Sequence, residues 1–288
     1  MPEYGTFSIV ACDLKARAWG VAVASKFLAV GAVVPWAKAR AGAIATQAVT
    51  NTSFGPRGLE MMASSEAAEE VLSRLVTADK EREHRQVGMV DAEGRSASFT
   101  GEQCADWAGG LTGPGYAIQG NVLTGAEVVR QMEHAFLEAK AELPERLFAA
   151  LTAGGQAGGD RRGRQSAAIL VVKPKAGYGG HDDRWIDLRV DDHINPIPRL
   201  GELLELHRLF FRRGDKKDRV RLEGEVVTKI QAIMKGLGYY TPVDGQYDDA
   251  TREAFRAFIH NENLEKRADP DAGWIDGPAL DYLIRRLK

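Results

Sequence analysis

Cysteine is scarce in this chain, and neither sign of charge prevails. The 288 residues include two cysteines, too few for a disulfide framework and without metal-ligand spacing. Cys12 lies in an apolar run and is predicted to be a small core residue, whereas Cys104 has no nearby histidine and is not predicted to be a nucleophile. Lysine and arginine number 38 against 40 aspartates and glutamates, a net charge of -2. This balance argues against nucleic acid as a partner, because such binding depends on a positive surface.

Long hydrophobic runs are also missing. The longest, FLAVGAVVPWA at 27–37, is interrupted by Gly31 and Pro35 and is too short to span a bilayer. The opening residues MPEYGTFSIVACDLK have no basic segment and carry two acidic side chains, unlike a signal peptide. We therefore expect a cytoplasmic protein with no membrane partner. The hydrophobic share of 44% and charged share of 27% are typical of a globular chain.

Cofactor and metal patterns are not found either. The chain has neither the GxxxxGK[ST] phosphate-binding pattern nor the HExxH zinc pattern. Histidines and aspartates gather between residues 181 and 193, but without metal-ligand spacing, and aspartate pairs often end strands and turns. We expect no cofactor and no catalytic metal.

The first two thirds of the chain alternate between strands and helices. Buried strands are expected where polar residues are sparse, and helices where apolar residues recur every three to four positions. The predicted strands are 6–13, 19–25, 28–34, 41–48, 86–91, 95–100, 116–121, 166–173 and 183–191. The predicted helices are 55–63, 66–78, 125–141, 144–154 and about 198–213. Hairpins separated by helix pairs predict an α+β fold, with two sheets packed face to face and helices outside.

A charged segment, RRGDKKDRVR at 212–221, marks a change in composition. After it, the apolar pattern predicts three helices, at 224–238, 248–261 and 277–287. We therefore predict two domains, residues 1–213 and a smaller helical domain at 214–288.

Thr6 is the most informative residue of the chain. It follows Gly5 at the start of the first predicted strand. If the bond before it is cut, its own α-amine, which titrates near ~8, can act as the base that activates its hydroxyl. The alternative is an ordinary β-branched strand residue.

Two regions resemble known families. The motifs TFSIVA at 6–11, ATQAVTNTSFGPRGLEMM at 45–62 and GGDRRGRQSAAILVV at 158–172 resemble domain-of-unknown-function family 1028, which is related to the N-terminal-nucleophile (Ntn) hydrolases. This resemblance implies a four-layer αββα sandwich and a threonine that attacks an amide carbonyl. The segments 230–258 and 274–287 resemble a peptidoglycan-binding-like domain, which implies a glycan or peptidoglycan fragment as a possible partner.

One difference from the resembled family concerns Thr6. Family members often begin Met-Thr-Phe-Ser, whereas MPEYG precedes the threonine here. Thr6 then needs cleavage after Gly5 to gain a free amine. Either the chain is a precursor, or Thr6 is not an Ntn nucleophile.

Five residues are predicted to be catalytic. Thr6 is the nucleophile, Ser25 a hydroxyl relay and Lys26 the cation that lowers the nucleophile's pKa, with Lys38 as a weaker alternative. Asn51 or Asn121 is the oxyanion donor. The alternatives are a hairpin end with a solvated lysine, a helix cap at Asn51 and a turn at Asn121.

Five more residues are predicted to bind substrate: Gln47, Arg57, Gln119, Asp160 and Arg164. Arg57 and Arg164 can pair with an anionic group, and the glycines around Asp160 permit close backbone approach. The alternatives are a surface arginine, a turn and a disordered basic loop.

The leading hypothesis is an Ntn-type hydrolase of a small amide or peptide. The second is a non-catalytic protein that binds a ligand or a peptidoglycan fragment on the same fold. The third is a catalytic pocket built from Ser25 and the 158–165 loop, without processing. A homodimer is expected, since sandwiches of this class often assemble.

Overall fold

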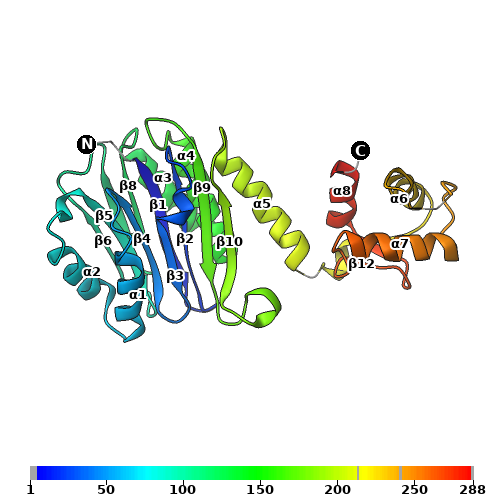
Figure 1. Cartoon of the computed structure of the whole chain (residues 1–288), viewed down its shortest axis with the longest axis horizontal. Coiled ribbons are helices and arrows are strands. Elements are labelled where there is room, and N and C mark those ends of the chain that lie inside the picture. Colours follow the sequence, from blue (N-terminus) through cyan, green and yellow to red (C-terminus); the bar gives the residue numbers. More distant parts are fainter. Residues whose placement is uncertain (1–4, 213, 240–241, 287–288) are drawn as a thin grey trace. The chain divides into compact units, whose positions relative to one another are not determined.

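A computed structural model describes residues 5–212, 214–239 and 242–286. The chain divides into two compact units between Leu203 and Leu204. The described residues form eight α-helices and three antiparallel sheets (Figure 1). The predicted mixture of helices and antiparallel sheets is therefore confirmed. No helix in this part of the chain is both long and apolar enough to cross a membrane.

The first unit contains a six-stranded sheet in the order β10-β9-β2-β1-β8-β7. Its strands are β1 (Thr6–Asp13), β2 (Ala18–Ser25), β7 (Gly109–Gly113), β8 (Tyr116–Asn121), β9 (Ser166–Val172) and β10 (Arg184–Val190). β1 lies in the middle and pairs with both β2 and β8. The β1–β2 hairpin forms because two apolar, β-branched segments flank a short polar turn. This pairing places the start of β1 beside the ends of its two neighbours.

A four-stranded sheet packs against the first. It contains β3 (Pro35–Lys38), β4 (Gly42–Ala48), β5 (Arg85–Asp91) and β6 (Ser96–Thr100), in that order. Because side chains alternate along a strand, Ala43 and Ala45 of β4 join a buried cluster with Val10 and Val21 of the six-stranded sheet. Ile44 points the other way, into a cluster with Phe54 and Leu75 of the helices.

The predicted strand at 28–34 is instead a short 3-10 helix, Val30–Ala32. Ala29 adopts a left-handed backbone (φ 52°), and the amides of Ala32 and Val33 bond to carbonyls three residues earlier. The strand begins only at Pro35. Val30 and Val34 of this segment are buried all the same, which explains why its composition resembles that of a buried strand, whereas Leu28 is exposed.

Two helix pairs cover the outer faces of the sheets. α1 (Phe54–Ala63) and α2 (Ala68–Thr77) contact the four-stranded sheet, and α3 (Glu127–Glu138) and α4 (Leu143–Gln156) contact the six-stranded sheet (Figure 1). Each buries one apolar stripe; that of α2 consists of Ala68, Val71, Leu72, Leu75 and Val76. α5 (Pro196–Phe211) follows β10.

The second unit contains the three predicted helices, observed as α6 (Glu225–Gly236), α7 (Asp249–Asn261) and α8 (Gly277–Arg286). Phe255, Phe258 and Leu283 lie at the centre of its core. Three short strands that the sequence analysis missed form a small sheet: β11 (Arg219–Arg221), β12 (Ala268–Asp269) and β13 (Trp274–Asp276). With two or three residues each, they carry too little alternation to be detected.

A buried ion pair supports the end of β4. The Arg85 guanidinium donates to Asp79 Oδ2 over 2.9 Å and to the carbonyl oxygen of Val49 over 2.7 Å. Asn51 also donates to Asp79, over 2.9 Å. The side chains of Arg85 and Asp79 are only 8% and 10% exposed. The hydrogen bond from Arg85 lowers the pKa of Asp79 from 3.8 to about 2.

This pKa shift predicts a pH-dependent contribution to stability. A carboxylate whose pKa is lowered on folding stabilises the protein above its unfolded pKa and loses that contribution as the pH falls toward the folded value. We expect Asp79→Asn to lower the free energy of unfolding by about 2 kcal/mol at pH 7, and the deficit to shrink between pH 4 and pH 2. Urea denaturation across this range measures it. Glu93→Gln, at an exposed ion pair with Arg95, is the matched control and should change stability little. Equal stability of Asp79→Asn and the parent at pH 7 would contradict the prediction.

Candidate functional site

Thr6 lies at the first position of β1, with a neighbour on each side. Strand pairing places Ser25, the last residue of β2, opposite Thr6 on one side and Asn121, the last residue of β8, on the other. All three side chains are buried, with Thr6 4% exposed. The structure therefore brings together three of the five predicted catalytic residues.

The carbonyl oxygen of Gly5 is surrounded by hydrogen-bond donors. The hydroxyl groups of Thr6 and Ser25 donate to it over 2.6 Å and 2.5 Å, and the guanidinium of Arg162 donates over 3.0 Å. The two hydroxyl oxygens are 3.2 Å apart. Donors that converge on one carbonyl oxygen polarise the carbonyl and stabilise negative charge on the oxygen.

Asp160 holds Arg162 in this position. Its carboxylate, 1% exposed, accepts two hydrogen bonds from the Arg162 guanidinium, over 3.0 Å and 2.7 Å, and one from the backbone amide of Lys26, over 2.9 Å. A Cβ placed on Gly5 would lie 2.7 Å from the same carboxylate, so glycine is required there. Asp160 thus connects the loop after α4 to Gly5, just before β1, and to Lys26, just after β2.

A buried polar network lies beneath Thr6, between the sheets. Gln47 of β4 donates to the Thr6 carbonyl oxygen over 3.2 Å and to Gln86 over 2.9 Å, and accepts from Ser8 over 2.6 Å. Asn121 donates to Gln86 over 2.8 Å, and Gln119 donates to Ser8 over 2.6 Å. Such a network fixes the relative positions of its members, since an unpaired buried amide is costly. Within the described residues, the Oδ1 atom of Asn121 is buried without a hydrogen-bond partner.

A cavity of about 320 Å³ adjoins Thr6. Its walls come from the start of β1, from the segment after β2, and from the end of β4 with the residues that follow it: Thr6, Phe27, Val30, Val33, Val34, Ala48, Val49, Thr50 and Thr52. None of these nine residues is charged. Val30, Val34 and Ala48 are buried, while Thr52 at the rim is exposed. The Arg85–Asp79 pair described above supports one wall through Val49.

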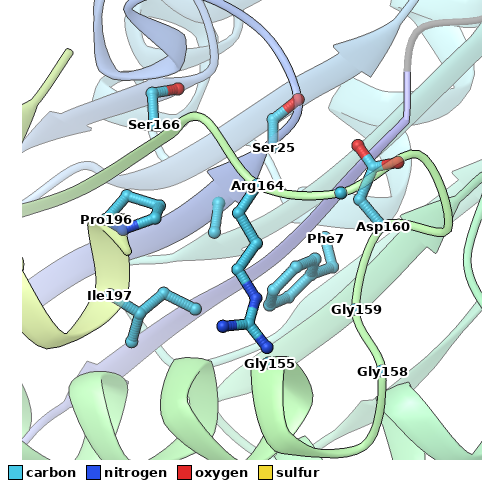
Figure 2. Close-up of a pocket in the computed structure, with 12 residues that line it drawn as sticks. Phe7, Ser25, Gly155, Gly158, Gly159, Asp160, Arg164, Ser166, Pro196 and Ile197 are labelled. Atoms are coloured by element: carbon cyan, nitrogen blue, oxygen red, sulfur yellow. The ribbon is translucent and has the colours of Figure 1, made fainter. Parts of the chain in front are cut away.

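A smaller cavity of about 20 Å³ lies on the opposite face of β1, beside Phe7 (Figure 2). Phe7 points to the opposite face of β1 from Thr6, because neighbouring residues of a strand alternate. Ser25 and Asp160 of the cluster around the Gly5 carbonyl also line this smaller cavity. The predicted substrate-binding residue Arg164 lies here. Figure 2 shows its guanidinium directed toward Gly155 and away from Ser25 and Asp160.

Three other predicted residues lie outside the cluster around the Gly5 carbonyl. Asn51 is half-buried and donates to Asp79, while its Oδ1 accepts from Ser53 as in a helix-start turn. Arg57 is exposed on α1 and does not line the Thr6 cavity. Lys26 is exposed, and its backbone amide binds Asp160.

Sequence reasoning missed Arg162, Gln86 and Ser8. Arg162 lies in the same Gly-rich segment as Asp160, and an aspartate followed two residues later by arginine was the available signal. Ser8 is followed by apolar residues of β1, and Gln86 follows Arg85 at the start of the otherwise mostly apolar β5. A single polar residue in a buried strand needs a buried partner, and that partner is visible only in three dimensions.

The two thiols are not nucleophile candidates. Burial raises the pKa of Cys12 to about 12 and that of Cys104 to about 11. Both are therefore uncharged thiols near neutral pH, and the reactive form is the thiolate. Across the described residues, no group of three His, Cys, Asp or Glu side chains is arranged to hold a metal.

The fold and site define a two-unit mixed α/β protein with a buried threonine hydroxyl beside an uncharged cavity. The chain belongs to a family of unknown function, DUF1028, whose model matches residues 6–200. A peptidoglycan-binding-like domain, PG_binding_2, matches residues 209–283.

A solved structure from the same family is similar to this chain. It is the crystal structure of protein SPO2555 from Silicibacter pomeroyi, with 32% sequence identity and a TM-score of 0.65. The match covers 74% of this chain and 92% of that chain. No curated protein matches.

Proposed function

We propose that this chain is an Ntn-type amide hydrolase acting on a small amide or peptide, with Thr6 as the nucleophile after loss of residues 1–5. Of these, residues 1–4 lie outside the described residues. The proposal includes the four-layer αββα arrangement of such hydrolases, which the two facing sheets and outer helix pairs support. The observation that supports it most directly is the environment of the Gly5 carbonyl. Its oxygen accepts hydrogen bonds from Ser25 and Arg162 and lies 2.6 Å from the Thr6 hydroxyl oxygen.

Self-cleavage would proceed in two steps. The Thr6 Oγ attacks the Gly5 carbonyl carbon, and its proton passes to the Thr6 nitrogen as the carbon–nitrogen bond breaks, leaving an ester. Water then hydrolyses this ester, which yields the Gly5 carboxylate and regenerates the Thr6 hydroxyl beside the α-amine that the first step released. Negative charge develops on the Gly5 oxygen, where Ser25 and Arg162 donate.

Turnover of substrate would use the new amine. The α-amine accepts the Thr6 hydroxyl proton while the oxygen attacks the substrate carbonyl, and then returns a proton to the departing amine. Water releases the acyl group from the resulting ester. Strand pairing with Thr6 favours Asn121 over Asn51 as the proposed oxyanion donor. Lys26 remains a proposed cation of this site.

Thr6 is tested first. We expect the chain that starts at Thr6 to form a covalent adduct with a threonine-directed β-lactone, and the full-length chain to form it only after losing residues 1–5. Intact mass with peptide mapping measures both. Thr6→Ala should abolish cleavage and labelling, and Thr6→Ser should retain them, because serine keeps the hydroxyl. Labelling of folded Thr6→Ala at the parent level would refute the proposal.

Arg162 is tested by its effect on cleavage. We expect Arg162→Gln to slow release of residues 1–5 by about 10²–10³-fold, the usual loss when one oxyanion donor is removed. Arg161→Gln removes an equal charge from the neighbouring position and should cleave at the parent rate. A time course of intact mass measures the rates, and circular dichroism checks the fold. Equal rates for the two variants would remove Arg162 from the mechanism.

A second candidate is non-catalytic binding of a peptidoglycan fragment, which the match of residues 209–283 supports. We expect retention of the full chain on purified peptidoglycan, with Thr6→Ala retained equally, because the two regions are separate in sequence. Sedimentation with insoluble peptidoglycan measures the bound fraction. No retention would exclude this candidate. A homodimer likewise remains a prediction.

A further inference from the structure

The cavity beside Thr6 has a chemical character that selects among amides. Phe27, Val30, Val33, Val34 and Val49 supply most of its wall. Val30 and Val34 belong to the buried cluster between the sheets, and Phe27 and Val33 pack against that cluster. The floor of the cavity is therefore an extension of the hydrophobic core, and the cavity favours an apolar occupant.

The size of the cavity indicates how large that occupant is. A buried apolar cavity of about 150 Å³ is enough to bind benzene. The volume here, about 320 Å³, is roughly twice that. An acyl chain of about six to ten carbons fits such a space.

The position of the cavity and its uncharged walls argue against a charged occupant. Thr6 itself forms part of the wall, so a group in the cavity is next to the nucleophilic hydroxyl. Burying a charged group against uncharged walls carries a large desolvation cost. The charged pair of the site, Asp160 and Arg162, is not among the lining residues. The polar side chains at the rim are the uncharged Thr50 and Thr52, which suit the amide end of a substrate rather than an ionised acyl group.

We propose that this cavity binds the acyl part of the substrate and that the preferred substrates are amides of uncharged, apolar acyl groups of medium length. That the ligand is hydrolysed rests on the proposed function. That the ligand is apolar rests on the cavity alone. Transfer of each methylene into an apolar cavity strengthens binding about three- to fourfold. The acyl chain length is therefore the specificity-determining feature, and Val33 is a residue that sets it.

Measurement of turnover tests the preference for medium-length acyl groups. The chain that starts at Thr6 is given acetyl, butyryl, hexanoyl, octanoyl and succinyl p-nitroanilides. We expect kcat/KM to rise at least 100-fold from acetyl to octanoyl, and the anionic succinyl substrate to be slower than butyryl. Val33→Phe should reduce the octanoyl value at least tenfold and leave the acetyl value nearly unchanged. Leu28→Phe, at a 59% exposed residue that does not line the cavity, is the matched control. A flat chain-length profile, or a preference for succinyl, would overturn the proposal.

A binding measurement distinguishes failure of the apolar ligand site from failure of the proposed hydrolase function. Calorimetric titration of the full-length chain with octanamide, acetamide and succinamate needs no catalysis. We expect octanamide alone to bind, and Val33→Phe to weaken its binding at least tenfold while Leu28→Phe does not. Binding with this pattern but no turnover would refute the hydrolase and retain the apolar ligand site. No octanamide binding by folded protein would refute the site whatever the turnover.

Discussion

The arrangement of the site depends on the buried carboxylate of Asp160. A buried charge is tolerated only when it is paired and hydrogen-bonded, and breaking such a pair costs several kcal/mol. Asp160 meets this requirement with the Arg162 guanidinium and the Lys26 amide, and its position leaves room only for glycine at residue 5. One side chain thereby fixes the loop after α4, the end of the β1–β2 hairpin and the donor on the Gly5 carbonyl.

The second constraint is the polar network between the sheets. Face-to-face sheets ordinarily bury apolar side chains, yet Ser8, Gln47, Gln86, Gln119 and Asn121 are buried here. Their amides bind one another and the Thr6 carbonyl, which sets the distance between β1 and the four-stranded sheet at the end where Thr6 lies. The rest of the same interface, around Val10 and Ala45, is apolar. The interface between the sheets therefore has polar groups at the Thr6 end and a packed apolar core at the other end. Together they fix the position of Thr6 and leave a cavity beside it.

Prediction from sequence succeeded where local pattern was sufficient. The β1–β2 hairpin follows from two continuous apolar segments around a polar turn, and the apolar stripe of α2 follows from its helical period. Prediction from sequence failed where pairing with a distant segment determines the secondary structure. β7 is GGLTG, which has almost no side-chain pattern and is a strand because it pairs with β8. The 28–34 segment has the composition of a buried strand, but its backbone turns as a 3-10 helix before Pro35.

The candidate site likewise has features that the sequence predicts and features that depend on the tertiary structure. Sequence alone identified Thr6, Ser25 and Asn121 as polar residues at strand ends, together with Asp160, because residue type and position in a strand are local properties. The tertiary structure decided which of these residues meet. It brought Arg162 to the Gly5 carbonyl across 157 positions of the chain, and it directed Arg164, two residues further on, to the opposite face of β1. Strand register and loop closure control these encounters, and both depend on contacts between segments far apart in the sequence.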